Sequence, residues 1–329
     1  MKKKRDRKKR KILLAIIMIL FTAVVLSAST YAWFTANRTV TVESIDVTVS
    51  TSTGLQISVD AANWKSIVTN ADIKGATWTG VVNQLPTAPN TAVPVSTAGV
   101  VNAGKLEMFK GTIEADATSG DNLLTAVKST ETLGTAGDFV VFDLFFQSTI
   151  AQTVYLTSNS SVVAKGTATG IQNAARVAFI KEGSVAAGST AAQAQGIVGS
   201  ESVKIWEPNY DVHTANGVAN ALNVYGITVG QTSGGKLAYN GVKAPIAKAN
   251  GIRLNSTDEN YFSPVTTVGS VEAGIPESTY INAFDVAAGI TKVRIYMWIE
   301  GQDVDCEDKA SGGSLNYSLQ FSIDSSSGS

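Results

Sequence analysis

Alternation of apolar and polar residues with a period of two recurs along this chain of 329 residues. Because successive side chains of a strand point to opposite faces, this pattern predicts strands with one buried face. The clearest example lies near the C-terminus, where the apolar residues are Leu315, Tyr317, Leu319, Phe321 and Ile323. Apolar or alternating segments also occupy residues 39–50, 55–59, 139–147, 153–157, 175–180 and 293–299. The sequence therefore predicts an all-β protein.

Two of these segments carry further information. Within residues 39–50 the apolar phase shifts after Glu43 and Ser44, and this odd step predicts a β-bulge. Residues 139–147 are apolar on both faces apart from Asp143, so we expect this strand in the middle of a sandwich. Residues 153–157 follow after a short connection and are expected to form a hairpin with it.

Long stretches rich in Ala, Gly, Ser and Thr separate the strands, at residues 86–104, 158–200 and 211–250. Loops of that length without structure of their own are uncommon in compact domains, so we expect insertions that hold short helices and hairpins. Residues 191–196 and 215–222 are the expected helical turns. Residues 33–329 are treated as one β-sandwich domain, and a second domain within the insertions stays open.

The N-terminus combines a basic run with an apolar segment. Nine of the residues 2–11 are Lys or Arg, residues 12–26 are almost wholly apolar, and small residues follow. This order is typical of a secretory signal and argues against a nucleic-acid-binding tail. We predict a signal peptide over residues 1–32, cleaved between Ala32 and Trp33. The alternative is an uncleaved membrane anchor, since about 20 apolar residues span a bilayer.

Both interpretations of the N-terminus place the rest of the chain outside the cell, secreted or at the cell surface. Contact with a membrane is expected only through this N-terminal segment, and no nucleic-acid partner is expected. A content of 16% charged residues fits an extracellular β-protein better than a cytosolic enzyme, because typical soluble domains carry about 25%.

The composition also excludes most catalytic chemistry. The chain has one His and one Cys, which leaves no internal disulfide framework and few ligands for zinc. His213 beside Asp211 is a conceivable base, but no recognisable Ser or Cys nucleophile motif accompanies it, and an HExxH motif is missing. We expect no enzymatic activity.

The densest acidic cluster comprises Asp303, Asp305, Glu307 and Asp308. Carboxylates at alternate positions of a loop can hold Ca²⁺, so a weak calcium site is one interpretation and the only cofactor considered. The spacing is not that of an EF-hand, and a solvated acidic turn between the last two strands is the interpretation we favour. The negative charge around Cys306 is expected to raise the pKa of its thiol and to make it a poor nucleophile.

Trp64 and Trp78 lie in surroundings rich in Asn and Thr. If exposed, these two rings would offer a platform for a carbohydrate ligand. If buried, they would fill a core, which is the commoner use of tryptophan in sandwiches. Ligand binding through Trp64 and Trp78 is therefore kept as the alternative.

Both ends of the chain resemble segments of known exported proteins. The segment Thr30-Tyr31-Ala32-Trp33-Phe34-Thr35, followed by a strand, resembles the start of the TasA/camelysin family of exported surface and biofilm-matrix proteins of Gram-positive bacteria. The segment from Trp298 to Cys306 and the final strand resemble the end of a broader group of exported proteins. This resemblance implies a jelly-roll-like antiparallel β-sandwich, here with long inserted loops and short helices. It also implies fibres in which each N-terminal strand completes the sheet of the next subunit.

The residues themselves allow such a joint. Cleavage after Ala32 would leave a free end that runs directly into the strand at about 39–50. Pairing this strand with a neighbour would bury Val40, Val42, Ile45, Val47 and Val49. The same strand could instead pair within its own sheet and give a monomer. We therefore predict a structural protein that forms a homopolymer by strand donation, with a monomeric surface adhesin or glycan-binding module as the alternative.

Overall fold

The computed structural model describes residues 33, 39–49, 54–86, 92–115, 122–219, 239–250, 252, 258–269 and 281–323. The predicted signal peptide, including Ala32 on one side of the predicted cleavage site, lies outside these residues. Among the helices in the described ranges, none has the length and apolar character needed to cross a membrane.

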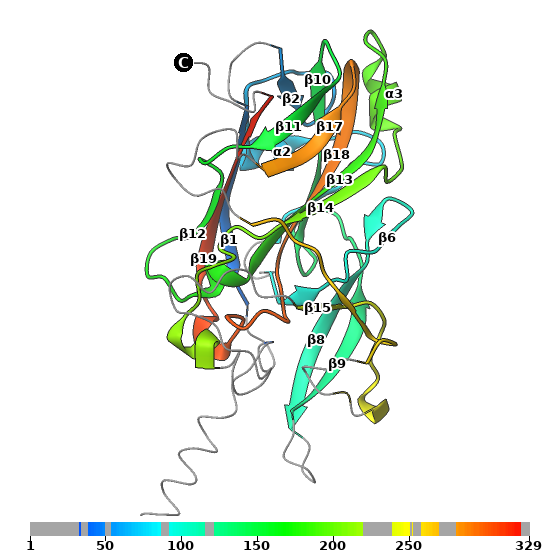
Figure 1. Ribbon diagram of the computed structural model, residues 1–329. Helices are drawn as coiled ribbons and strands as arrows, with labels where there is room; N and C mark the ends of the chain where they lie inside the picture. Colours follow the sequence, from blue (N-terminus) through cyan, green and yellow to red (C-terminus); the bar gives the residue numbers. More distant parts are fainter. Residues whose placement is uncertain are drawn as a thin grey trace, which may run out of the picture.

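Two six-stranded sheets dominate the fold (Figure 1). The sheet that contains the first strand, here the N-terminal sheet, has the order β17 (Ile281–Val286), β11 (Gln152–Leu156), β19 (Ser314–Ser322), β1 (Thr41–Val49) and β3 (Ile67–Thr69), and β12 (Ser161–Ala164) pairs with β19. The other, here the central sheet, has the order β14 (Ser202–Trp206), β13 (Ala175–Val185), β18 (Gly289–Ile299), β10 (Val140–Ser148) and β2 (Gln56–Ser58), and β4 (Asn83–Gln84) pairs with β10. The expected all-β sandwich is confirmed.

The main hydrophobic core lies between these two sheets. One face of β10 contributes Val140, Phe142, Leu144 and Phe146, as the apolar run predicts. The ring of Phe146 meets those of Phe284 and Phe321 edge to face, with centroids 4.8 and 5.3 Å away. Burial of large side chains from both sheets holds the layers together, because each contributes about 1.5–3 kcal/mol.

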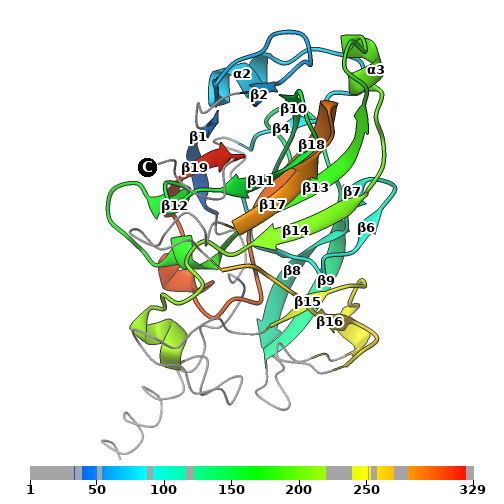
Figure 2. The same cartoon turned by 45° about the horizontal axis from the view of Figure 1, so that its top comes forward.

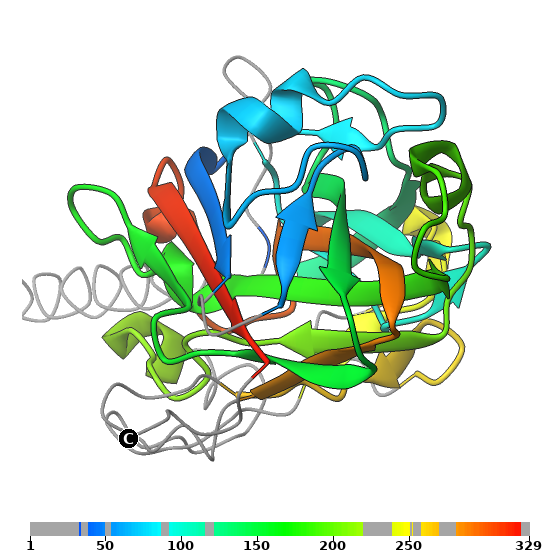
Figure 3. The same cartoon turned by 90° about the horizontal axis from the view of Figure 1, so that it is seen from above.

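Strand β1 lies inside the N-terminal sheet of its own chain. It pairs in parallel with β19 on one side and antiparallel with β3 on the other. Figure 3 shows β1 (blue) and β19 (red) side by side. The register shifts between Val42 and Ser44, which confirms the predicted bulge. The parallel pairing departs from the expected antiparallel pattern, because the first and last strands enter the sheet from the same end.

The expected hairpin between residues 139–147 and 153–157 is wrong. Strand β10 pairs with β18, β2 and β4 in the central sheet, whereas β11 pairs with β17 and β19 in the N-terminal sheet. The short connection after β10 therefore crosses from one layer of the sandwich to the other.

The expected insertion at 158–200 is also wrong in part, because β12 and β13 within it belong to the two main sheets. Its predicted helical turn is confirmed as α3 (Ala191–Gln195), which begins at a capping box of Thr190 and Gln193. A second capping box, of Thr69 and Asp72, begins α2 (Asn70–Gly75). Of the helical turn expected at 215–222, residues 215–219 are helical and the rest lies outside the described residues.

The remaining elements form a side lobe next to the central sheet (Figure 2). The lobe contains β5 (Val95–Ser96), β6 (Val101–Asn102), β7 (Lys105–Leu106), β8 (Met108–Ala115), β9 (Asn122–Ser129), β15 (Asn240–Val242), the 3-10 helix η2 (Lys248–Asn250) and β16 (Phe262–Pro264). Strands β8 and β9 form its long hairpin. Trp298 packs with Val95, Leu106 and Met108, so the lobe shares a core with the outer face of the central sheet.

Candidate functional site

Strand β1 presents its predicted apolar side chains to the main core. Val40, Ile45, Val47 and Val49 are buried, and Val42 is half-buried against the same core. Between them, Asp46 is exposed. The strand therefore holds its place by apolar burial on one face and by backbone hydrogen bonds to β19 and β3 along its edges.

Trp33, the residue after the predicted cleavage site, is buried between the sandwich and the side lobe. Its indole N–H donates to Oε1 of Gln302 at 3.0 Å. The ring lies so close to Gly301 and Gly111 that a Cβ atom on either glycine would be 2.5–2.8 Å from ring atoms. The two glycines thus form a slot, and Phe109 and Phe262 belong to the apolar cluster around the ring.

The predicted acidic turn connects β18 to β19, but it is not solvated. Asp303, Asp305 and Glu307 are buried, as is Glu300 just before them, and Asp308 begins a short 3-10 helix, η4 (Asp308–Ala310). The expectation of a solvated turn is wrong, because the turn packs beneath the ends of neighbouring strands, where each carboxylate finds a partner in the chain.

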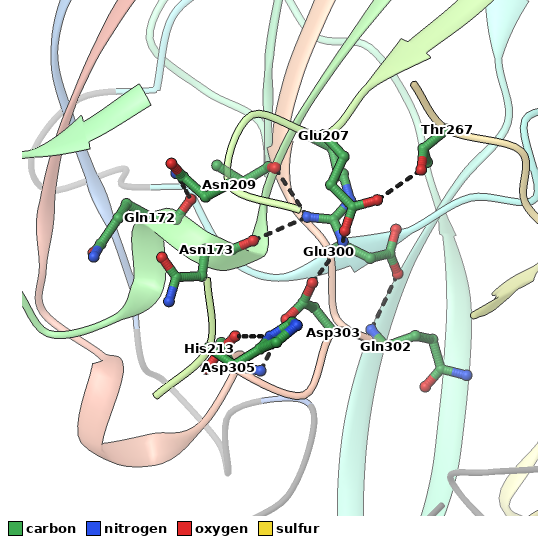
Figure 4. Close-up of polar contacts among 12 residues, drawn as sticks. Gln172, Asn173, Glu207, Asn209, His213, Thr267, Glu300, Gln302, Asp303 and Asp305 are labelled. Carbon is green, nitrogen blue, oxygen red and sulfur yellow. Dashed lines mark hydrogen bonds and ion pairs between the residues drawn. The ribbon is translucent and has the colours of Figure 1, made fainter. Parts of the chain in front are cut away.

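A buried arginine is one of these partners. Arg176 of β13 donates to Oε1 of Glu207 at 2.7 Å and to Oδ2 of Asp303 at 2.5 Å. Oε2 of Glu207 accepts the Thr267 hydroxyl at 2.6 Å. Figure 4 shows Glu207, Asp303 and Thr267 in this arrangement. Arg176 and Glu207 are functional candidates that the sequence analysis missed.

His213 is the second basic partner. Its Nδ1 lies 2.8 Å from Oδ2 of Asp305, and its side chain is only 3% exposed. The sequence had placed His213 beside Asp211, but the residue that it contacts is Asp305, 92 positions away. Burial lowers the pKa of His213, but the hydrogen bond to the Asp305 carboxylate and the charges of Asp305 and Asp303 outweigh it and raise the pKa.

We call Arg176, Glu207, His213, Glu300, Asp303 and Asp305 the acid-rich cluster. Within it, burial raises the pKa of Glu300 to about 7 and that of Asp303 to about 6. Glu300 accepts hydrogen bonds from the Trp298 indole at 3.0 Å and from the Gln302 backbone at 3.1 Å. Among the described residues, no group of three or more acidic, His or Cys side chains is arranged to hold a metal ion.

Cys306 lies in the same turn and is fully buried. Burial raises the pKa of its thiol well above the ordinary value. A backbone hydrogen bond from Trp33 lowers it, and the charges of Asp303 and Glu300 raise it further. The expected poor nucleophile is consistent with this environment.

With this geometry established, the chain can be compared with known proteins. No protein-family model, curated protein or solved structure matches it.

A second buried ionic cluster lies on the outer face of the central sheet. Arg294 holds both carboxylate oxygens of Asp143, at 2.7 and 3.1 Å, and Lys292 lies 2.7 Å from Glu182. Glu131 lies 3.7 Å from Arg294 and 3.1 Å from Lys105 at the rim. We call Lys105, Glu131, Asp143, Glu182, Lys292 and Arg294 the balanced cluster, because three acids meet three bases. Asp143, which interrupts the apolar run, faces Arg294 directly across the β10–β18 pair.

Trp64 and Trp78 are half-buried and pack against one small cluster that includes Phe145. The indole of Trp78 meets the Phe145 ring edge to face at 5.7 Å, and Lys292 lies 5.2 Å from its ring centre. A recess of about 460 Å³ lies nearby, lined by polar residues that include Asp60, Asn63, Lys65 and Asp72. Neither tryptophan lines this recess.

Proposed function

We propose that this chain is an exported, non-catalytic structural subunit that assembles into a homopolymer by exchange of strand β1. In the single chain β1 pairs within its own sheet, which is the arrangement expected of a monomer. The observation that carries the proposal is that this place, between β19 and β3, is an inner one. An inner strand supplied from the start of the chain can be supplied equally by a second copy, because the same register and the same buried contacts are then formed between subunits.

The contacts of β1 are sufficient for a firm joint. Ile45, Val47 and Val49 of β1 and Val40 just before it are buried, and each contributes about 1.5–3 kcal/mol before the cost of ordering the strand. Trp33 adds a large buried ring to the same segment. Exchange conserves all these contacts, so the balance between monomer and polymer depends on concentration and on the connection after β1. The resemblance of the N-terminal segment to exported surface and matrix proteins supports the polymer.

Electron microscopy of the mature chain tests the proposal. Residues 33–329 are expected to form filaments, whereas residues 51–329 are expected to stay as particles that bind a synthetic peptide of residues 33–50. The variant Ile45→Lys places a charge in the core and is expected to block assembly, whereas the matched control Asp46→Lys on the exposed face is not. Folded, discrete mature particles at high concentration after long incubation would overturn the proposal.

The recess beside α2 favours a second candidate, a monomeric surface adhesin that binds a glycan. Its polar lining offers a carboxylate, an amide and an ammonium group within one hollow, which suits hydroxyl groups of a sugar. A glycan array probed with the monomeric protein tests this candidate. Binding that Lys65→Ala reduces, and that Lys74→Ala on the exposed helix surface does not, would support it.

A further inference from the structure

Both the side chain and the backbone of Trp33 have partners in the fold. The indole is fixed by Gln302 and by the slot of Gly301 and Gly111. The backbone of the same residue forms a hydrogen bond with the Cys306 thiol, which is itself buried beside Asp303 and Glu300. The residue that would begin the mature chain thus has a defined place next to the acid-rich cluster.

The acid-rich cluster carries a surplus of negative charge. Glu207, Glu300, Asp303 and Asp305 are all buried, at 0–7% exposure. Within the described part of the chain, these acids form ion pairs with Arg176 and His213. Buried carboxylates without a matching cation are costly, so a further positive group placed here would be bound favourably.

We propose that the acid-rich cluster is a binding site for the α-ammonium group of Trp33, which forms when the peptide bond after Ala32 is hydrolysed. Hydrolysis consumes one water molecule, leaves a carboxylate on Ala32 and gives Trp33 a protonated amine. A neutral amide nitrogen with one proton is thereby replaced by a cation with three N–H donors. This nitrogen lies at the Cys306 thiol, which is within the electrostatic influence of Glu300 and Asp303. The indole slot positions this nitrogen, and Gln302 fixes the orientation of the ring.

Removal of the signal peptide would then tighten the fold as well as release the protein. In the uncleaved chain the same place receives an uncharged peptide group, and the carboxylates remain undercompensated. The inference concerns the mature chain by itself and does not require that the protein form fibres. It uses the predicted cleavage site only to choose which residue comes first.

The decisive comparison is between two chains that differ by one residue. Chains that begin at Trp33 and at Ala32 can both be released from a cleavable fusion partner and unfolded in urea at pH 7. In the second chain the ammonium group moves one residue away, about 3.8 Å along the backbone. We expect the unfolding equilibrium constant of the Trp33 chain to be about 10- to 100-fold smaller, the range for hydrogen bonds to charged groups. Equal constants within about twofold would overturn the proposal.

Two further variants separate charge from packing. Acetylation of the Trp33 amine keeps the indole and removes the charge, so it is expected to abolish the advantage. Glu300→Gln combined with Asp303→Asn is expected to close the gap between the two chains, whereas Asp46→Asn, an exposed acid on β1, should leave it unchanged. If the double variant does not fold, the rate at which an acylating reagent modifies the Trp33 amine decides. Slow labelling in the native protein supports the site, and labelling as fast as in urea overturns it.

Discussion

The two buried ionic clusters both include a residue of β13, and they draw on β18 or on the turn that follows it, yet they differ in charge balance. The balanced cluster sets Asp143, Glu182 and Glu131 against three basic side chains. The acid-rich cluster sets four buried acids against Arg176 and His213. The acids of both clusters are buried, so the clusters differ in how much of their negative charge is compensated by basic side chains.

In the balanced cluster every charge has a counter-charge within 3.7 Å, although burial raises the pKa of Glu182 there too. An acid-rich cluster stores unfavourable electrostatic energy unless it binds protons or a cation. Proton uptake is favoured by the raised pKa values of Glu300 and Asp303. The proposed Trp33 ammonium group would supply the cation. The balanced cluster therefore stabilises the sheet by itself, whereas the stability of the acid-rich cluster depends on pH and on an added cation.

The largest expected effect separates the two clusters by removing one arginine from each. Arg294→Met leaves buried acids unpaired and should cost about 3–5 kcal/mol of unfolding free energy. Arg176→Met should cost a similar amount at pH 7 but clearly less at pH 5, because Asp303 then takes up a proton. Urea unfolding at both pH values measures this difference. If the two variants had the same loss of unfolding free energy at pH 7 and the same recovery at pH 5, the proposed difference between the clusters would be wrong.

A control for both variants is Lys181→Met, whose partner Glu201 is half exposed. Exposed ion pairs contribute about 0–1 kcal/mol, so this substitution should change the stability little.

The second prediction concerns pH and a chain that begins before Trp33. Glu300, with a pKa raised to about 7, and Asp303, with a pKa raised to about 6, hold protons more tightly in the folded than in the unfolded state. His213, whose pKa is also raised, acts in the same direction. Their contribution is therefore complete below the unfolded pKa values and is lost as the pH rises through the folded values. Between pH 5 and pH 8 the unfolding free energy should fall by on the order of 2–3 kcal/mol.

Thermal or urea unfolding as a function of pH checks this slope. Glu300→Gln should flatten it, and so should a chain that begins at Trp33, because its ammonium group compensates the same carboxylates. A slope that Glu300→Gln leaves intact would show that the pH dependence arises elsewhere in the molecule.

The sequence predicts the strands of this fold better than their partners. Alternation identifies β1, β10, β18 and β19, and the phase shift locates the bulge, because both follow from local side-chain direction. The crossing from β10 to β11 and the parallel β1–β19 pair depend on layer packing, which no local pattern records. For the same reason the sequence separates Arg176 from Asp303 by more than a hundred residues, although the fold joins them.

Part of the candidate site was nevertheless readable. Arg176 is a lone charge within the apolar strand 175–180, and such a charge needs a buried partner. Asp143 is likewise a lone charge in the apolar run of β10. Only the fold shows which residue is the partner. The sequence therefore indicates that a buried ion pair exists, but not which residues form it. This also explains why the acidic turn was expected to be solvated, since its basic partners come from β13 and from the segment around His213.

The smallest expected effect tests the slot that holds Trp33. Gly301→Ala would place a Cβ atom 2.5 Å from the indole ring, and relief of such overpacking typically costs about 1–3 kcal/mol. Gly75→Ala is the matched control, because a Cβ atom there meets nothing within 4 Å and the helix end tolerates alanine. Gly301→Ala should also reduce the difference between chains that begin at Trp33 and at Ala32, since a displaced indole moves the ammonium group away from Glu300 and Asp303. A Gly301→Ala variant could instead lose stability but keep the difference between the two chains. The acid-rich cluster would then bind the N-terminal ammonium group independently of how the indole ring is packed.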